Sequence, residues 1–237
     1  MFSIIACTNR QYAMQNVFKN YERQLFKEKE LIIVLNNDQM DVNRWKQEAA
    51  LYPNVTVLQQ PEHVTLGECY NIAIPQAKYP YIVKFDDDDY YSAYYLVEAA
   101  KGFRDSDAAV VGKSTVFIYY LRYKLLTLFN ENKEFVYVRN QKELATNYLV
   151  GATLLFRKDI FPTVSFEAIN VGEDTRFLEA CLQSNLLLYG TSRYNYVYMR
   201  YPNKSHHTST FWEYKLLEKS NRVGLMNDFQ DAIIRPV

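Results

Sequence analysis

The chain has 237 residues, enough for one large globular domain with a sizeable core. Hydrophobic residues make up 49% and charged residues 23% of it, a balance that excludes an intrinsically disordered chain. The 27 basic and 27 acidic side chains cancel, so the charge does not indicate nucleic acid as a partner. No stretch reaches the roughly 20 apolar residues of a transmembrane helix. The apolar run at the N-terminus lacks the basic start of a signal peptide and predicts a first strand.

Three cysteines, Cys7, Cys69 and Cys181, lie far apart among apolar neighbours. An odd, widely spaced set fits reduced thiols in a core better than a disulfide framework or a zinc site. We therefore expect a cytoplasmic protein.

The first hundred residues alternate short aliphatic runs with segments whose apolar residues recur at helical spacing. Solid aliphatic strands that alternate with helices imply a mostly parallel sheet with helices on both faces. We expect, in chain order, a strand at 2–7, a helix at 11–26, a strand at 31–35, a helix after Asp41, a strand at 55–58, a helix at 66–77, a strand at 81–85 and a helix at 92–103.

After Phe103 the pattern changes to successive short strands, which predict a smaller antiparallel sheet. The sequence contains no Gly/Ser/Pro linker and no repeat, so one domain over 1–237 is the simplest organisation. The expected elements are strands at 108–111, 114–120, 124–129, 135–138, 153–156, 186–189 and 196–199, a helix at 175–183 and a helical tail at 211–237.

Polar residues follow three of the first strands at their carboxyl ends. Thr8-Asn9-Arg10 follows the first strand, Asn36-Asn37-Asp38 the second, and Asp86-Asp87-Asp88-Asp89 the fourth. Open α/β sheets bind their ligands at this edge. The sequence therefore predicts a binding site there.

The acidic run at 86–89 places four carboxylates side by side, and Lys84 is the near neighbour in sequence that offsets their charge. A hard divalent cation such as Mn²⁺ or Mg²⁺ is the natural compensator, because such ions prefer oxygen ligands. The alternative is a solvated loop whose last aspartate caps the following helix. The position directly after a buried strand favours the metal site.

Two segments carry a resemblance to a known family. The opening strand with Thr8-Asn9-Arg10 is similar to a hydrophobic strand followed by T-x-N-R, and LGECYNIAIPQAKYPYIVKFDDDDYY at 66–91 is similar to a segment of Gly, Asn-x-Ala/Gly, a strand and D-x-D-D. On these residues the chain resembles the family 2 glycosyltransferases of the GT-A fold from residue 2 to residue 210. The resemblance implies an α/β GT-A fold, with a Rossmann-like, mostly parallel central sheet flanked by helices and a smaller antiparallel sheet on the acceptor side.

The same resemblance implies transfer of a sugar from a nucleotide diphosphate sugar to an acceptor hydroxyl, with Mn²⁺ or Mg²⁺ as cofactor. It makes Asp88 a metal ligand, Asp86 a contact to the ribose or sugar, and Asp89 a further metal or sugar contact. Residues 1–105 become the nucleotide-sugar-binding half and residues 106–210 the acceptor-binding half. The expected donor contacts are Thr8, Asn9, Arg10, Asn36, Asp38, Gly67, Asn71, Lys84, Asp86 and Asp87.

One departure concerns the nucleotide base. The family often has D-D-G-S after its second strand, and this chain has Asn36-Asn37-Asp38. An asparagine amide offers both a donor and an acceptor to a base. Family habit favours a UDP-sugar, and the substitution leaves the base open.

A second acidic pair, Glu173-Asp174, opens a predicted helix. Acidic residues also stabilise a helix N-terminus, so capping alone is the alternative interpretation. An acceptor hydroxyl, however, needs a carboxylate base to take its proton. The resemblance makes Asp174 that base and implies that Glu173 orients the acceptor. It also places Gly151 and Ala152 on the acceptor side and implies inversion at the anomeric carbon.

Two adjacent histidines, His206 and His207, lie in a polar segment near the end of the chain. Some GT-A enzymes use a histidine after the E-D helix as a further metal ligand. The resemblance favours His207 for this role, with His206 as the near alternative and an ordinary loop residue as the competing interpretation.

Two other functions compete with sugar transfer. A sugar-phosphate nucleotidyltransferase would need a glycine-rich loop after the first strand, where Thr8-Asn9-Arg10 offers no glycine. The other is a non-catalytic carbohydrate-binding protein on a decayed transferase fold, an alternative that remains because Asn36 stands where the family often has Asp. We expect a carbohydrate or glycoconjugate acceptor, as in bacterial surface or spore polysaccharide synthesis. For residues 114–140 three roles are open: an acceptor wall, a dimer surface or a peripheral membrane contact.

Overall fold

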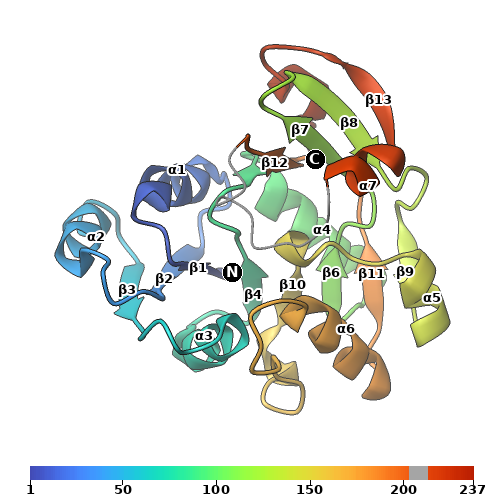
Figure 1. Ribbon diagram of the computed structural model, residues 1–237. Coiled ribbons are helices and arrows are strands. Elements are labelled where there is room, and N and C mark those ends of the chain that lie inside the picture. Colours follow the sequence, from blue (N-terminus) through green and yellow to red (C-terminus); the bar gives the residue numbers. More distant parts are fainter. Residues whose placement is uncertain (203–212) are drawn as a thin grey trace.

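The computed structural model describes residues 1–202 and 213–237. A large sheet runs across the molecule, and a smaller sheet lies against one end of it (Figure 1). The strands of the large sheet are, in the order in which they pair, β3 (Val55–Gln59), β2 (Lys29–Leu35), β1 (Phe2–Thr8), β4 (Tyr81–Lys84), β10 (Leu155–Arg157), β6 (Val110–Gly112), β11 (Leu188–Gly190) and β9 (Val136–Val138).

The first half of the large sheet is parallel, as the aliphatic runs predict. β1 pairs in parallel with both β2 and β4, and β2 pairs in parallel with β3. The carboxyl ends of these strands therefore meet at one edge, and the polar segments that follow β1, β2 and β4 lie there. β10 and β9 run antiparallel to their neighbours, so the second half of the sheet is mixed.

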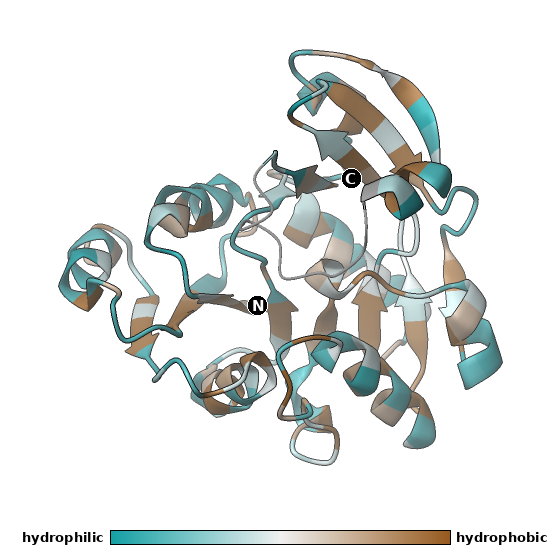
Figure 2. Ribbon diagram, in the orientation of Figure 1, coloured by the Kyte–Doolittle hydropathy of each residue, from teal (hydrophilic) through white to brown (hydrophobic). Residues whose placement is uncertain are grey.

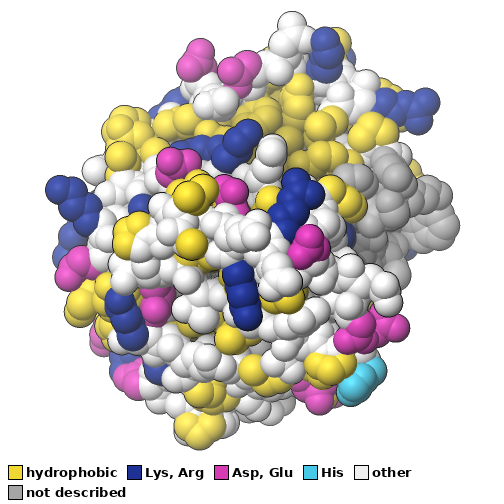
Figure 3. Space-filling view, turned by 90° about the vertical axis from the view of Figure 1, so that its left-hand side faces the viewer, with side chains coloured by type: hydrophobic (Ala, Val, Ile, Leu, Met, Phe, Trp, Pro, Cys, Tyr) yellow, Lys and Arg dark blue, Asp and Glu magenta, His cyan; other side chains and the backbone are white. Residues whose placement is uncertain are grey.

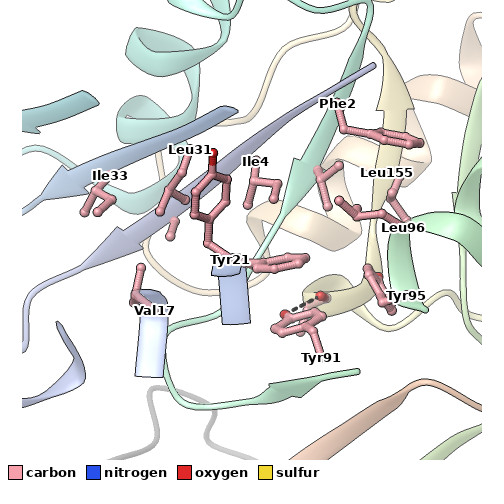
Figure 4. Close-up of a cluster of buried hydrophobic side chains, with 14 of the residues drawn as sticks. Phe2, Ile4, Val17, Tyr21, Leu31, Ile33, Tyr91, Tyr95, Leu96 and Leu155 are labelled. Carbon is pink, nitrogen blue, oxygen red and sulfur yellow. Dashed lines mark hydrogen bonds between the residues drawn. The ribbon is translucent and has the colours of Figure 1, made fainter. Parts of the chain in front are cut away.

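Helices cover both faces of the large sheet, because alternate strand residues point to opposite sides. One face packs against α1, α2 and α4, and the other against α3, α5 and α6. Figure 4 shows Val17 and Tyr21 of α1 against Ile4, Leu31 and Ile33 of β1 and β2. The helices are α1 (Met14–Arg23), α2 (Val42–Ala49), α3 (Leu66–Ala73), α4 (Tyr95–Ser106), α5 (Gln141–Thr146) and α6 (Glu173–Gln183), with short 3₁₀ turns at Gln11–Ala13, Ile74–Gln76, Gly151–Thr153 and Lys158–Ile160.

The hydropathy of the chain follows this layering. Figure 2 shows hydrophobic strands in the centre and hydrophilic outer surfaces on the helices. Every helix within residues 1–202 and 213–237 is too short or too polar to span a bilayer.

The smaller sheet is mostly antiparallel, as expected from the short strands after Phe103. Its strands are, in pairing order, β13 (Ser220–Leu225), β8 (Leu125–Phe129), β7 (Val116–Tyr120), β12 (Tyr196–Arg200) and β5 (Tyr90–Tyr91). On the face shown in Figure 3, hydrophobic side chains gather in the upper part, at the height of this sheet, among Lys and Arg side chains.

The prediction of a helical tail at 211–237 is wrong in part. The tail contains two short helices, α7 (Glu213–Glu218) and α8 (Gln230–Ile233), but β13 lies between them and pairs antiparallel with β8. The open edge of β8 supplies backbone partners for Ser220–Leu225, and no local helical pattern can match that ladder of hydrogen bonds. The tail therefore completes the smaller sheet.

Candidate active site

The acidic run connects the two sheets. Asp86–Asp89 leave the end of β4 in the large sheet and lead directly into β5 in the smaller one. Carboxylate oxygens of Asp86, Asp88 and Asp89 lie within 4.8 Å of one another. The turn therefore concentrates negative charge at the junction of the sheets.

Side chains from α1 hold this turn through its backbone. Asn16 Nδ2 donates to the carbonyl oxygens of Asp87 and Asp89, both at 2.9 Å, and Asn20 Nδ2 donates to that of Asp89, also at 2.9 Å. The motifs in the sequence pointed to neither asparagine. Their spacing of four residues on a helix, with Asn20 on the buried side, is the signal that would have found them.

Tyr91 supplies a third anchor, also missed. Its hydroxyl accepts from the Asp86 backbone N–H at 2.8 Å and donates to the Ala152 carbonyl at 2.7 Å. The ring is fully buried and stacks on Phe85, with 3.8 Å between the ring centroids (Tyr91 and its hydrogen bond appear in Figure 4). Tyr91 thus ties the acidic turn to the Gly151–Thr153 segment.

The four aspartates have different partners. Asp87 is buried; it accepts from the Thr8 hydroxyl and pairs with Arg10 Nη1 at 2.6 Å. Asp89 is also buried and accepts from the Tyr196 hydroxyl and, at 2.9 Å, from the Met199 backbone N–H.

Asp86 and Asp88 face a cavity instead. Asp88 also lies 3.3 Å from Arg10 Nη1. Among the four, these two alternate residues are therefore the ones placed to meet a ligand.

Burial and mutual repulsion disfavour the charged forms of these carboxylates. Burial, with the charge of Glu173 and Asp87 adding to it, raises the pKa of Asp86 to about 6. Burial, with the charge of Asp87 and Asp86 adding to it, raises the pKa of Asp88 to about 8. A divalent cation such as Mg²⁺ or Mn²⁺ would offset this repulsion, because such ions bind carboxylate oxygens.

The cavity has a volume of about 980 Å³ and joins the acidic turn to the second acidic pair. Glu173 and Asp174 begin α6, as predicted, and both line the cavity together with Asp86 and Asp88. Side chains of β7, β8 and β12 in the smaller sheet and of α5 and α7 also line it. The structure therefore brings together in one space two acidic sites that lie far apart in sequence.

Asp174 is held closely. Its Oδ1 accepts from the Thr175 backbone N–H at 2.7 Å, and Tyr148 reaches the Thr175 hydroxyl at 3.1 Å. A Cβ atom on Gly151 would overlap Asp174 Oδ2 and lie 2.6 Å from its Cγ. Glycine is therefore the residue that leaves room for the Asp174 carboxylate.

Residues 3–164, more than half of the chain, match the sequence profile described as Glycosyl transferase family 2. The chain belongs to this family.

Solved structures support the fold of this family 2 glycosyltransferase. The crystal structure of S. aureus TarS 1-349 in complex with UDP-GlcNAc has a TM-score of 0.65 at 17% identity, over 92% of this chain and 63% of that chain. Mannosyltransferase PcManGT from Pyrobaculum calidifontis, in complex with GDP-Man and Mn²⁺, has a TM-score of 0.58 at 15% identity, over 86% of this chain and 57% of that chain. The GT-A fold predicted from the sequence is confirmed, and the chain spans less than two thirds of either structure. The search among curated proteins found no match.

The expected donor contacts at the strand ends of this glycosyltransferase fall into two groups. Those at the end of β1 reach the acidic turn or the segment after β2, and those after β2 contact the segment that follows β3. Thr8 and Arg10 reach Asp87, while the Asn9 carbonyl accepts from Asn37 Nδ2 at 3.4 Å. Asn36 Nδ2 donates to the Pro61 carbonyl at 2.8 Å, and Asp38 accepts from the Glu62 N–H at 3.4 Å.

Gly67 and Asn71 of α3 support a neighbouring segment. Asn71 Nδ2 donates to the Phe166 carbonyl at 2.8 Å, and its Oδ1 accepts from the Phe166 N–H at 3.0 Å. A Cβ atom on Gly67 would overlap the Glu167 carbonyl oxygen. Both residues thus hold the chain that leads to α6.

Lys84 and Glu173, expected as a donor contact and an acceptor contact, pair with each other at 3.0 Å. Gly151 and Ala152 lie at the cavity, as expected for acceptor-side residues. His206 and His207 fall outside the described residues.

Proposed function

We propose that this chain transfers a sugar from a nucleotide diphosphate sugar to an acceptor hydroxyl. One observation carries the proposal: a single cavity of about 980 Å³ is lined both by Asp86 and Asp88 and by Glu173 and Asp174. A nucleotide sugar that binds along the strand ends would present its diphosphate to the acidic turn. Its anomeric carbon would then lie toward the acceptor side.

The carboxylates would divide the chemistry. Asp88 and Asp89, both expected from the sequence as metal ligands, would hold Mg²⁺ or Mn²⁺, which when bound supplies positive charge against the diphosphate leaving group. Asp86, expected as a contact to the ribose or sugar, has its carboxylate in the same cluster, so we propose it as a further metal ligand. Asp174 would take the proton of the acceptor hydroxyl as that oxygen attacks the anomeric carbon. Attack from the side opposite the diphosphate inverts the anomeric configuration.

The donor and acceptor are proposed by class. TarS was solved with UDP-GlcNAc and PcManGT with GDP-Man, so both bases are reasonable probes, and we favour a UDP-sugar. We propose a carbohydrate or glycoconjugate acceptor from bacterial surface polysaccharide synthesis. We also infer a cytoplasmic setting, since Cys7, Cys69 and Cys181 are free thiols and reduced thiols are the rule in the cytosol.

The test measures nucleoside diphosphate released from UDP-GlcNAc and from GDP-Man, with and without Mn²⁺, in the presence of acceptor glycans. Metal-dependent release of UDP or GDP together with a glycosylated product supports the proposal. Release of pyrophosphate from a nucleoside triphosphate with a sugar phosphate would indicate a nucleotidyltransferase instead. Donor binding without turnover would indicate a binding protein on this fold.

A further inference from the structure

Lys84 lies on β4 between the two acidic sites, and its ammonium group is enclosed. Its Nζ is 3.0 Å from Glu173 Oε1, and the two side chains are only 3% and 8% exposed. The ring centroids of Tyr70 and Phe166 lie 4.7 and 5.7 Å from Nζ. The lysine thus has one carboxylate partner and two aromatic faces around it.

Lys84 lines the same cavity as the acidic turn and the acidic pair that begins α6. Of the acidic side chains at this cavity, Glu173 is the one that its ammonium group contacts directly, as a hydrogen-bonded ion pair.

The Lys84–Glu173 pair ties the start of α6 to β4. The helix begins at Glu173, and the residue before it, Gly172, has a φ of +84° and offers no side-chain cap. The side-chain contacts that hold the first turn therefore include those of Glu173 with Lys84 and of Asp174 with the Thr175 N–H. Because a buried carboxylate without its partner is strongly unfavourable, the ion pair fixes Glu173, and Asp174 follows it directly in the chain.

We propose that Lys84 is a positioning residue for sugar transfer, which holds Glu173 at the start of α6 and thereby keeps Asp174 against Gly151 at the cavity. The proposal rests on the proposed function and adds a role for this pair. Glu173 then acts on Asp174 through the helix start, in place of the acceptor contact expected from the sequence. Lys84 likewise acts on the side of the cavity that holds the catalytic base Asp174, in place of the donor contact expected from the sequence.

The chain contains a matched control. Lys113 pairs with Glu98 at 2.8 Å, and these side chains are 3% and 9% exposed. The Lys113 ammonium group also donates to Thr191, and Glu98 accepts from Ser192 and Asn195. Neither Lys113 nor Glu98 lines the cavity that holds Asp174. Lys84→Met and Lys113→Met therefore remove equivalent buried cations, one at the cavity and one in a packing contact.

The experiment compares the two variants with the wild type in melting temperature, Mn²⁺-dependent donor affinity, kcat and amide exchange of residues 173–178. Both variants should lose stability. Lys84→Met alone should lower kcat about 100-fold, as expected for a misplaced catalytic group, keep donor affinity, and speed exchange at the start of α6. A loss of donor affinity with unchanged kcat, or equal kcat losses in both variants, would overturn the proposal.

A double variant separates folding from positioning. Lys84→Met/Glu173→Met removes both members of the pair, so neither charge is left buried without its partner and stability should recover toward the wild type, while kcat stays low and the start of α6 exchanges fast. Full recovery of kcat would overturn the proposal. If the wild type shows no transfer at all, the proposed function fails on its own. In that case the exchange data still test the pair, since unchanged exchange in Lys84→Met contradicts it.

Discussion

The two acidic sites that share the cavity are held in opposite ways. The turn at 86–89 is fixed by hydrogen bonds from Asn16, Asn20 and Tyr91 to its backbone atoms. Its carboxylates are therefore available for other partners. The pair at the start of α6 is fixed through its side chains, since Glu173 pairs with Lys84 and Asp174 fills the space beside Gly151. A site that collects a cation tolerates repulsion because the ion relieves it, whereas a base must be held by groups that leave one oxygen free.

The largest expected difference lies between neighbours in the acidic turn. Asp87→Ala removes the buried partner of Arg10 and Thr8, so it should lower the free energy of unfolding by about 3–5 kcal/mol and leave Mn²⁺ binding in place. Asp88→Ala removes a carboxylate that burial and repulsion disfavour, so it should raise the melting temperature and abolish Mn²⁺ binding. Denaturant unfolding and calorimetric Mn²⁺ titration measure both; equal effects of the two substitutions would contradict this division.

A similar substitution tests the base side. Gly151→Ala places a methyl group on the Asp174 carboxylate and should displace it, with a loss in kcat of about 100-fold. Mn²⁺-dependent donor binding should remain. Gly224→Ala is the control, because the nearest atom to its added Cβ is the end of the Met226 side chain at 3.4 Å. Steady-state kinetics with separate donor titration distinguishes them, and an unchanged kcat in Gly151→Ala would remove Asp174 from the reaction.

The acidic turn should also make metal binding depend on pH. The pKa of Asp86 is raised to about 6 and that of Asp88 to about 8, so protons must leave before a cation binds, and Mn²⁺ affinity should rise by up to about tenfold per pH unit between these values. The folded, metal-free protein holds these protons more tightly than the unfolded chain. Its stability should therefore fall as the pH rises from 3.8 through about 8.

Calorimetry across this pH range measures the affinity, and thermal unfolding with and without Mn²⁺ measures the stability. Asp88→Asn should flatten both curves. A metal affinity that does not change between pH 6 and 8 would contradict the raised pKa values.

The smallest expected effect concerns the link between the sites. Tyr91→Phe removes the hydroxyl that joins the Asp86 N–H to the Ala152 carbonyl and should cost about 1–3 kcal/mol of stability. Because both sites keep their own anchors, kcat should change little. A large loss of kcat at full Mn²⁺ binding would show that the two sites are positioned as one unit.

Local patterns predicted the parts of this molecule that local patterns determine. Aliphatic runs indicated the parallel strands. The acidic turn was predicted after a strand and the Glu173-Asp174 pair at the start of a helix, and the structure has both there. The helix expected at 11–26 begins with a 3₁₀ turn at Gln11–Ala13 and ends at Arg23. Such boundaries depend on the packing of the ends, which periodicity does not report.

The features that the sequence did not reveal all depend on distant partners. β13 forms because β8 has an open edge, and Asn16 and Tyr91 matter because the acidic turn lies beside them in space. Asn71 was expected at the donor, and its amide bonds to Phe166, 95 positions further along the chain. Contacts of this range have no signature in a single sequence.

The most direct test of the two-site division compares Asp88→Ala with Asp174→Asn, with the exposed Asp105→Ala as control. The measurement is Mn²⁺-dependent donor binding beside the single-turnover rate of transfer. We expect Asp88→Ala to lose metal-dependent binding, and Asp174→Asn to bind donor as the wild type does while transfer falls by about 100- to 10,000-fold. Wild-type transfer in Asp174→Asn, or full metal-dependent donor binding in Asp88→Ala, would contradict the division.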